Sequence, residues 1–479
     1  MRHNTIHKLL WVTLMCIPCI HSTNGQTATP SVAGNYRATL WRTHIVLHLQ
    51  QDQTGSLTGT LDNVDQGESG ISCAQITLSG RQLSFTVPQF QLTYKGEVTA
   101  DGNTISGRVD QDTPLIFTRN VRASAASLSA RLAELDSTVT ADFAQHPVGS
   151  VTIGVVSANQ LIWTKSYGNA DMENHEPAAK DTVYRLGSIT KMFTALMLEQ
   201  LVDSNKVHLS DPVEKYFPDL NTVQGRFPGA PPITLIQLAT HTSGLGREPD
   251  DVDKYVHGGV SDWEKTLIAA LPHVHYIFEP GTRYSYSNIG YAVLGAALAR
   301  AAGQPYLDYV PQHVFEPLGM THSAVELTPR VLPQLSKGYQ MDGKAVDADT
   351  PQREQAGRGY KVPNGAIYTT VGDLARFCSF LMGYGPDAVL KTGSLQRYQY
   401  QLAIPSNSQL TRGYGLGFEL TRQDSYLAFG HTGAVAGYQA ALEINRDAEI
   451  GVIVLTNSIG PGTVNAGDLT LSSLDLLSK

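Results

Sequence analysis

The chain has 479 residues, of which 42% are hydrophobic and 16% are charged. This balance excludes a disordered protein, and at about 150 residues per domain the length predicts two or three domains with sizeable cores. The net charge of -8 argues against nucleic acid or an anionic membrane surface as the main partner.

The first 25 residues have the layout of a secretory signal peptide. Arg2 and Lys8 precede an apolar run from Leu9 to Ile20, and a polar stretch follows as far as Gly25. The run is shorter than the roughly 20 residues that a membrane-spanning helix needs. We therefore expect cleavage near residue 25, no transmembrane segment, no lipid anchor, and a secreted or periplasmic protein. A buried N-terminal strand or helix is the alternative interpretation.

The cysteines give no framework for covalent or metal cross-links. Two of the four, Cys16 and Cys19, lie in the predicted leader, so the mature chain would keep Cys73 and Cys378. One pair so far apart in sequence predicts no disulfide network, and no zinc-ligand spacing is present.

Residues 27–121 are predicted to form a small all-β domain. The run 83–87 alternates apolar and polar side chains, as a half-buried strand does. Turn signals at 53–55 and 100–103 separate such runs, and helix signals are scarce. We expect a barrel or sandwich with an accessory role, and binding of a sugar, lipid or peptide remains open.

Residues 125–479 mix helices and strands and are predicted to form one larger domain. Apolar residues at helical spacing predict a helix over 125–143, and two apolar runs joined by a turn predict a β-hairpin over 150–163. Later elements are expected at three places: strands near Leu442 and Val452–Val454, and a closing helix over Gly467–Lys479.

Ser188 and Lys191 are the first candidates for chemistry. They are three residues apart just before the apolar run Met192–Leu198, so on a helix their side chains share one face. A serine hydroxyl becomes nucleophilic when a neighbour takes its proton, and a buried lysine can act as that base because desolvation disfavours its charge. The spacing alone is weak evidence, since Ser188 as a helix cap and Lys191 on a solvated face explain it equally simply.

Two further segments carry polar groups suited to the same chemistry. Tyr286 lies two residues before Asn288, so one segment offers a phenol that can shuttle a proton and an amide that can hold a lysine and a substrate carbonyl. Tyr284 is a nearby alternative without an asparagine two positions on. The segment Phe429–Tyr438 contains His431, and its glycines let the backbone approach a ligand closely. Taken alone, Tyr286 has a plainer interpretation as a core aromatic residue and His431 as a turn residue.

Taken in order, these segments resemble a known family. Ser188–Lys191, Tyr286–Asn288 and His431–Gly433 resemble the three motifs of the serine β-lactamase and penicillin-binding-protein family. The Tyr-x-Asn and His-x-Gly forms place the chain beside class C β-lactamases, D-amino-acid peptidases and related esterases. The resemblance covers residues 125–479 approximately and extends to five more segments: His241–Leu245, Pro317–Met320, Ala366–Thr370, Asp373–Leu374 and Tyr414–Phe418.

The resemblance implies a role for each matching residue. Ser188 matches the acylated nucleophile and Lys191 its activating partner, while Tyr286 matches the proton shuttle and Asn288 the amide that orients lysine and substrate. The N–H groups of Ser188 and Ala434 are expected to form the oxyanion hole. His431 stands where many relatives have lysine, which puts binding of a substrate carboxylate in doubt. Three residues are expected to contact the substrate: Thr432, Gly433 and Tyr438.

The resemblance also implies fold and function. The expected fold is α+β, of the β-lactamase/transpeptidase type, with a five-stranded antiparallel sheet, flanking helices and a helical lobe, preceded by the small all-β domain. The expected activity is that of a serine hydrolase that forms an acyl-enzyme on a small-molecule or peptide substrate, without a metal or other cofactor. An ester, a D-amino-acid peptide and a β-lactam all remain open, and His431 favours the first two.

Two other classes of function remain as alternatives. In one, the hydrolase domain is catalytically idle and the β-domain over 27–121 binds a ligand. In the other, both domains have only a structural or assembly role in the cell envelope.

Overall fold

A computed structural model gives the structure of the protein. It describes residues 31–40, 43–52, 54–63, 68–110, 112–119, 125–342, 345–355, 357–391, 394–395, 398–399, 404–407, 411–423 and 426–478. The leader predicted over residues 1–25 lies outside these ranges. Within them, no helix combines the length and the apolar character that crossing a membrane requires.

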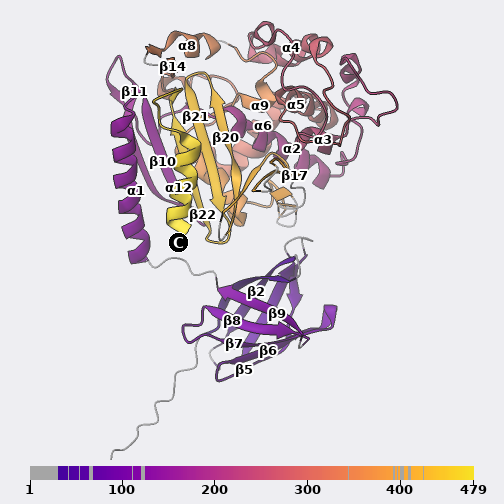
Figure 1. Ribbon diagram of the computed structural model, residues 1–479, viewed down its shortest axis with the longest axis vertical. Helices are drawn as coiled ribbons and strands as arrows, with labels where there is room; N and C mark the ends of the chain where they lie inside the picture. The colour runs from indigo at the N-terminus through magenta and orange to yellow at the C-terminus, as the bar shows by residue number, and fades with distance from the viewer. Residues whose placement is uncertain are drawn as a thin grey trace, which may run out of the picture.

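The N-terminal strands form one antiparallel sheet with its own hydrophobic core. Their spatial order is β4-β3-β2-β1-β9-β8-β7-β6-β5, and the sheet curls until β5 lies beside β3 (Figure 1). Tyr36, Phe85 and Phe117 are buried in its centre. The strand predicted over 83–87 is present as β6. The strands are β1 (Gly34–Leu40), β2 (Thr43–Gln51), β3 (Leu57–Asn63), β4 (Glu68–Ser72), β5 (Ala74–Ser79), β6 (Gln82–Val87), β7 (Leu92–Val98), β8 (Thr104–Val109) and β9 (Thr113–Arg119).

The second sheet has more strands than expected. Its order is β12-β11-β10-β22-β21-β20-β19-β18-β17, so the five expected strands, β11 to β20 in this order, are extended at both edges. Short hairpins from residues 404–422 add β17 to β19 beyond β20. The strands are β10 (Ser150–Ser157), β11 (Gln160–Asp171), β12 (Glu176–Pro177), β17 (Ile404–Pro405), β18 (Arg412–Tyr414), β19 (Glu419–Arg422), β20 (Leu427–Val435), β21 (Tyr438–Asn445) and β22 (Ile450–Thr456).

Helices cover both faces of this sheet, and together they confirm the α+β fold. On one face α1 and α12 pack side by side (Figure 1). Leu135, Val139 and Leu474 are buried in one cluster with Val452 of β22. On the other face α10 contacts β10, and the helical lobe lies beyond it. The helices are α1 (Ala125–Gln145), α2 (Thr190–Asp203), α3 (Leu235–Ala239), α4 (Trp263–Ala270), α5 (Asn288–Ala302), α6 (Tyr306–Val310), α7 (Glu316–Leu318), α8 (Asp349–Gln355), α9 (Val362–Gly365), α10 (Val371–Ser379) and α12 (Ala466–Ser478).

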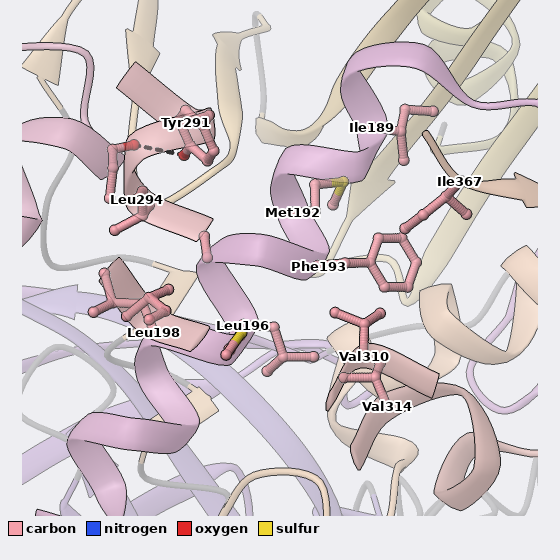
Figure 2. Close-up of a cluster of buried hydrophobic side chains, with 14 of the residues drawn as sticks. Ile189, Met192, Phe193, Leu196, Leu198, Tyr291, Leu294, Val310, Val314 and Ile367 are labelled. Carbon is pink, nitrogen blue, oxygen red and sulfur yellow. Dashed lines mark hydrogen bonds between the residues drawn. The ribbon is translucent and has the colours of Figure 1, made fainter. Parts of the chain in front are cut away.

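The helical lobe is built around α2, which is buried on all sides from Thr190 to Glu199. Figure 2 shows Phe193 and its neighbours on α2 among side chains of α5 and of the segment around Val310. The ring of Phe193 also stacks on Phe377 of α10, with 4.1 Å between ring centroids. Because apolar neighbours enclose the helix, the direction of its first turn is fixed.

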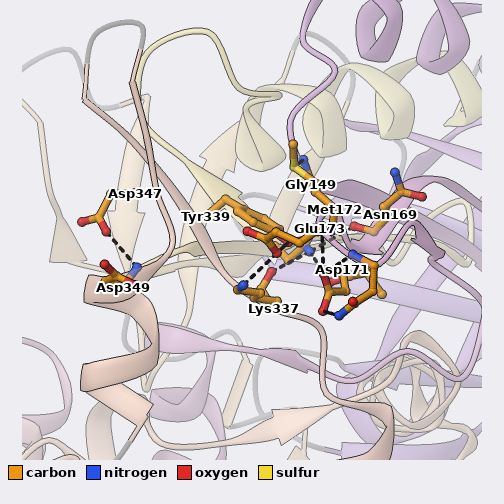
Figure 3. Close-up of polar contacts among 12 residues, drawn as sticks. Gly149, Asn169, Asp171, Met172, Glu173, Lys337, Tyr339, Asp347 and Asp349 are labelled. Carbon is orange, nitrogen blue, oxygen red and sulfur yellow. Dashed lines mark hydrogen bonds and ion pairs between the residues drawn. The ribbon is translucent and has the colours of Figure 1, made fainter.

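A polar cluster ties the end of β11 to β14 (Tyr339–Asp342), as Figure 3 shows. The Tyr339 hydroxyl accepts a hydrogen bond from the Met172 N–H (2.7 Å) and donates to Glu173 (3.0 Å), which also pairs with Lys337 (2.7 Å). β14 pairs in turn with β15 (Ala345–Asp347) and with β23 (Ser458–Ile459), which follows β22. These contacts hold the β11 edge of the sheet.

Candidate active site

Ser188 lies where the sheet meets the helical lobe. It occupies the 3-10 turn η3 (Gly187–Ile189), directly before α2. Gly187 has φ +52, and a side chain there would come within 2.8 Å of the Ala434 nitrogen. A side chain at Gly433 would come within 3.2 Å of the Ser188 nitrogen. These glycines let the backbones of η3 and β20 touch, which brings the amides of Ser188 and Ala434 close together.

Lys191 lies one turn further on, fully buried, with three acceptors around its amine. Its Nζ donates to Ser188 Oγ (3.1 Å), to Asn288 Oδ1 (2.9 Å) and to the Asn364 carbonyl (3.1 Å). Burial lowers the pKa of Lys191 well below its ordinary value, and the nearby charge of Glu248 opposes this shift. The amine is thus held against the serine in an environment that favours its neutral form.

Asn288 is the first residue of α5, and its orientation is fixed at both ends of the amide. Oδ1 accepts from Lys191, and Nδ2 donates to Glu248 Oε1 (2.7 Å). The helix start itself is fixed by Ser287, whose Oγ accepts from the Gly290 N–H (3.0 Å). The predicted contact of this amide with lysine is therefore present.

Tyr286 is the phenol nearest the serine. Burial raises its pKa well above the ordinary value, and a hydrogen bond with Ser188 and the charge of Arg247 act in the opposite direction. Lys191 Nζ lies 4.8 Å from the centroid of its ring. Tyr284 packs against His241, and no hydrogen bond joins it to Ser188 or Lys191 among the described residues. Of the two tyrosines considered from the sequence, Tyr286 has the better position.

Two predicted residues lie away from the serine. His431 is buried, with Nε2 at 2.9 Å from the Tyr414 hydroxyl and Nδ1 at 2.5 Å from the Thr432 carbonyl, and burial lowers its pKa. Tyr438 is also buried, and its hydroxyl donates to the Ser336 carbonyl. Their side chains are occupied inside the protein, whereas Thr432 and Gly433, the other residues expected to contact the substrate, lie on β20.

An open cavity of about 850 Å³ lies over this group of residues. Its wall includes residues of the Ser188 motif, of the Tyr286–Asn288 motif and of β20. His431 and Tyr438 do not line it. The residues that matter here are Ser188, Tyr286, Asn288, Thr432, Gly433 and Ala434. The cavity thus gives a ligand access to the serine hydroxyl and to both amides.

Four residues of the site were missed in the sequence: Arg247, Glu248, Asn364 and Glu419. Arg247 and Glu248 lie two and three residues after the end of the segment His241–Leu245, so that motif was a usable signal. Glu419, which accepts hydrogen bonds from Thr432, likewise follows Tyr414–Phe418. Asn364 contributes a backbone carbonyl, which no side-chain pattern reveals.

The chain is similar in sequence to known proteins. A curated relative, "Beta-lactamase-like protein 2" of Dictyostelium discoideum, is 28% identical over 330 residues, covering 67% of this chain and 58% of its own length. The chain thus spans less than two thirds of that relative.

Two solved structures share the fold. One is an octameric penicillin-binding protein homologue from Pyrococcus abyssi, with TM-score 0.61 and 24% identity over 72% of this chain and 77% of that one. The other is the D-alanine carboxypeptidase AmpC from Burkholderia cenocepacia, with TM-score 0.59 and 20% identity over 74% of this chain and 99% of that one.

The family assignment rests on a match along most of the chain. The family model described as Beta-lactamase matches residues 135–474, which include all three motifs. The chain belongs to the Beta-lactamase family of serine-hydrolase and penicillin-binding-protein-like proteins.

Proposed function

We propose that the protein is a serine hydrolase that cleaves a small ester or a peptide through an acyl-enzyme on Ser188. The observation that carries this proposal is the position of one buried amine. Lys191 Nζ lies 3.1 Å from Ser188 Oγ and 2.9 Å from Asn288 Oδ1, in surroundings that favour its neutral form. A neutral amine at hydrogen-bond distance from a hydroxyl is suited to take its proton.

In the first step Ser188 Oγ attacks the carbonyl carbon of the substrate and its proton passes to Lys191. The raised pKa of Tyr286 keeps its phenol protonated, so it donates a proton to the leaving group and is reprotonated from Lys191. The negative charge on the carbonyl oxygen rests on the N–H groups of Ser188 and Ala434. Each such donor contributes about 3 kcal/mol of transition-state stabilisation.

In the second step water replaces the leaving group. It attacks the acyl carbon and gives one proton to the amine of Lys191. The bond to Ser188 Oγ then breaks, and the serine regains a proton through the same amine and the phenol of Tyr286. The acid product leaves and the site is restored.

Among substrates we favour an ester or a peptide over a β-lactam. His431 stands where relatives often have lysine, and its ring is occupied by Tyr414 and Thr432. At this position on β20, therefore, a β-lactam carboxylate meets no positive charge. The names of the neighbours, which include a D-alanine carboxypeptidase, support the peptide as one member of this class.

The test is a substrate panel with a matched serine control. Nitrocefin, a p-nitrophenyl ester and a D-alanyl dipeptide are assayed with the parent protein, Ser188→Ala, and Ser261→Ala, which alters an exposed serine outside the cavity. We expect Ser188→Ala to lose turnover of every substrate that the parent cleaves, and Ser261→Ala to retain it. Full rate in Ser188→Ala would end the proposal. It would also favour the alternative in which residues 27–121 carry the function.

We also propose that the protein is exported, on the strength of the leader over residues 1–25. Fractionation of expressing cells, with N-terminal sequencing of the exported form, tests this. A mature form that begins near residue 26 is expected, and an uncleaved form confined to the cytoplasm would contradict it.

A further inference from the structure

The cavity above Ser188 contains a guanidinium that has no acceptor. Arg247 is exposed and lines this cavity with Tyr286 and Asn288. Within the described ranges, its guanidinium makes no ion pair and donates no hydrogen bond. A guanidinium in this position is suited to a ligand's carboxylate, which it binds through two parallel hydrogen bonds.

The position of Arg247 is fixed by the catalytic motif itself. Its carbonyl accepts hydrogen bonds from the N–H groups of Asn288 (3.0 Å) and Ile289 (3.2 Å) at the start of α5. Its guanidinium carbon lies 5.0 Å from the centroid of the Tyr286 ring. Backbone and side chain are thus both held against the motif, so a group bound by Arg247 would be held close to the reacting atoms.

The other cations near Ser188 are placed differently. Lys191 donates to three neutral acceptors, and Lys361 pairs with Glu248 (3.3 Å). Arg412 of β18 also lines the cavity, near the buried carboxyl of Glu443. Glu248 follows Arg247 in the chain, and within the described ranges no ion pair joins the two side chains. The oxygens of Glu248 take hydrogen bonds from the Asn288 amide and the Tyr360 hydroxyl.

Part of the wall of the same cavity is acidic. Glu419 of β19 and Glu443 of β21 both pair with Gly430 of β20, so they project from the same face of the sheet and only a glycine lies between them. Asp468, in the first turn of α12, lines the cavity beside them. Burial raises the pKa of Glu443 and favours its neutral form. Glu419 and Asp468 are therefore the carboxylates of this wall that repel an anionic group of a ligand, whereas Arg247 attracts one.

We propose that Arg247 binds an anionic group of the substrate, so that the preferred substrates are acyl donors carrying a carboxylate. This inference rests on the proposed function, because it concerns the substrate of the same site. The carboxylate can belong to the acyl part or to the leaving group, and both sources have the same chemistry at the guanidinium.

Two matched pairs of esters distinguish these sources. The first pair is mono-p-nitrophenyl glutarate and p-nitrophenyl valerate, in which only the acyl part changes charge. The second pair is 3-(valeryloxy)benzoate and its methyl ester, in which only the leaving group changes charge. We measure kcat/KM on both pairs for the parent, Arg247→Gln, Arg247→Lys and, as a control, Arg330→Gln, which removes an exposed charge outside the cavity.

For one of the two pairs we expect Arg247→Gln to lower kcat/KM of the anionic member by about tenfold to a hundredfold, the usual effect of losing a charge-assisted hydrogen bond. The neutral member should change less than about threefold, Arg247→Lys should retain part of the preference, and Arg330→Gln should retain all of it. Equal losses on anionic and neutral members of both pairs would overturn the proposal, because they would assign Arg247 only to the support of Tyr286.

A binding measurement separates this inference from the proposed function. Ser188→Ala is titrated calorimetrically with N-phenylglutaramate and with its neutral analogue valeranilide, with and without Arg247→Gln. We expect tighter binding of the anion, lost in the double variant. Equal affinities for both ligands in Ser188→Ala would overturn the Arg247 proposal whatever the turnover. If the parent cleaves no ester through Ser188 but Ser188→Ala still binds the anion more tightly than the neutral analogue, only the proposed function fails.

Discussion

At the scale of single residues, the proposed chemistry depends on the protonation of one buried amine. Lys191 has its pKa lowered by burial, so its neutral fraction grows as pH rises toward that lowered value and is complete above it. Tyr286 has its pKa raised, so its phenol stays protonated over the same range. Both shifts favour the required forms, a neutral amine and a protonated phenol.

The pKa shifts of Lys191 and Tyr286 predict how the rate depends on pH. With a neutral ester, kcat/KM should rise with pH through the lowered pKa of Lys191 and then form a plateau well below the ordinary lysine value. A stopped-flow or steady-state profile between pH 5 and 10 measures it. A rate that falls steadily as pH rises through this range would contradict the role of a neutral amine.

The same amine is tested by substitution. Lys191→Arg keeps a positive charge, but a guanidinium does not give up its proton, so we expect a loss of about 10²–10⁴-fold in kcat. Lys361→Arg, which alters a lysine paired with Glu248, serves as the control and should stay close to the parent rate. If Lys191→Arg keeps most of the activity, another base must act.

The two tyrosines give a paired prediction. Tyr286→Phe removes the phenol that hydrogen-bonds Ser188 and should lower kcat by about a hundredfold or more, whereas Tyr284→Phe should change it little. The same ester assay, with circular dichroism to check folding, measures both. The reverse order of effects would move the proton shuttle to Tyr284.

At the scale of elements, the junction between η3 and β20 holds the serine and the oxyanion hole together. Gly187→Ala places a methyl group 2.8 Å from Ala434 and puts alanine at φ +52. The left-handed conformation alone costs about 1–2 kcal/mol, and the contact forces η3 away from β20. We expect lower stability in urea and a larger fall in kcat than in KM. An unchanged kcat would show that these backbones need not touch.

The elements also show what sequence could and could not predict. The helix expected over 125–143, the hairpin over 150–163 and the closing helix at the C-terminus are present, because their apolar spacing matches their buried faces. The strands β17 to β19 were missed, because they are short and owe their place to successive pairings: β19 pairs with β20, β18 with β19 and β17 with β18. Asn364 was missed for a related reason, since only the tertiary fold brings its carbonyl to Lys191.

At the scale of the whole molecule, two hydrophobic cores are separate: one inside β1 to β9 and one around α2. We propose that the first belongs to an accessory domain over residues 27–121 that does not support catalysis. Phe117→Ala should cost that domain about 3–5 kcal/mol while leaving ester hydrolysis near the parent rate. Calorimetry followed by an activity assay tests this, and a parallel loss of activity would mean that the two cores depend on each other.

The covalent step is tested most directly by trapping it. The parent protein and Ser188→Ala are each incubated with a fluorescent acyl phosphonate, then digested and examined by mass spectrometry. We expect one added phosphonyl group on the peptide that contains Ser188, and no adduct in the variant. Labelling of another residue with equal turnover, or an adduct that persists in Ser188→Ala, would contradict acyl transfer through this serine.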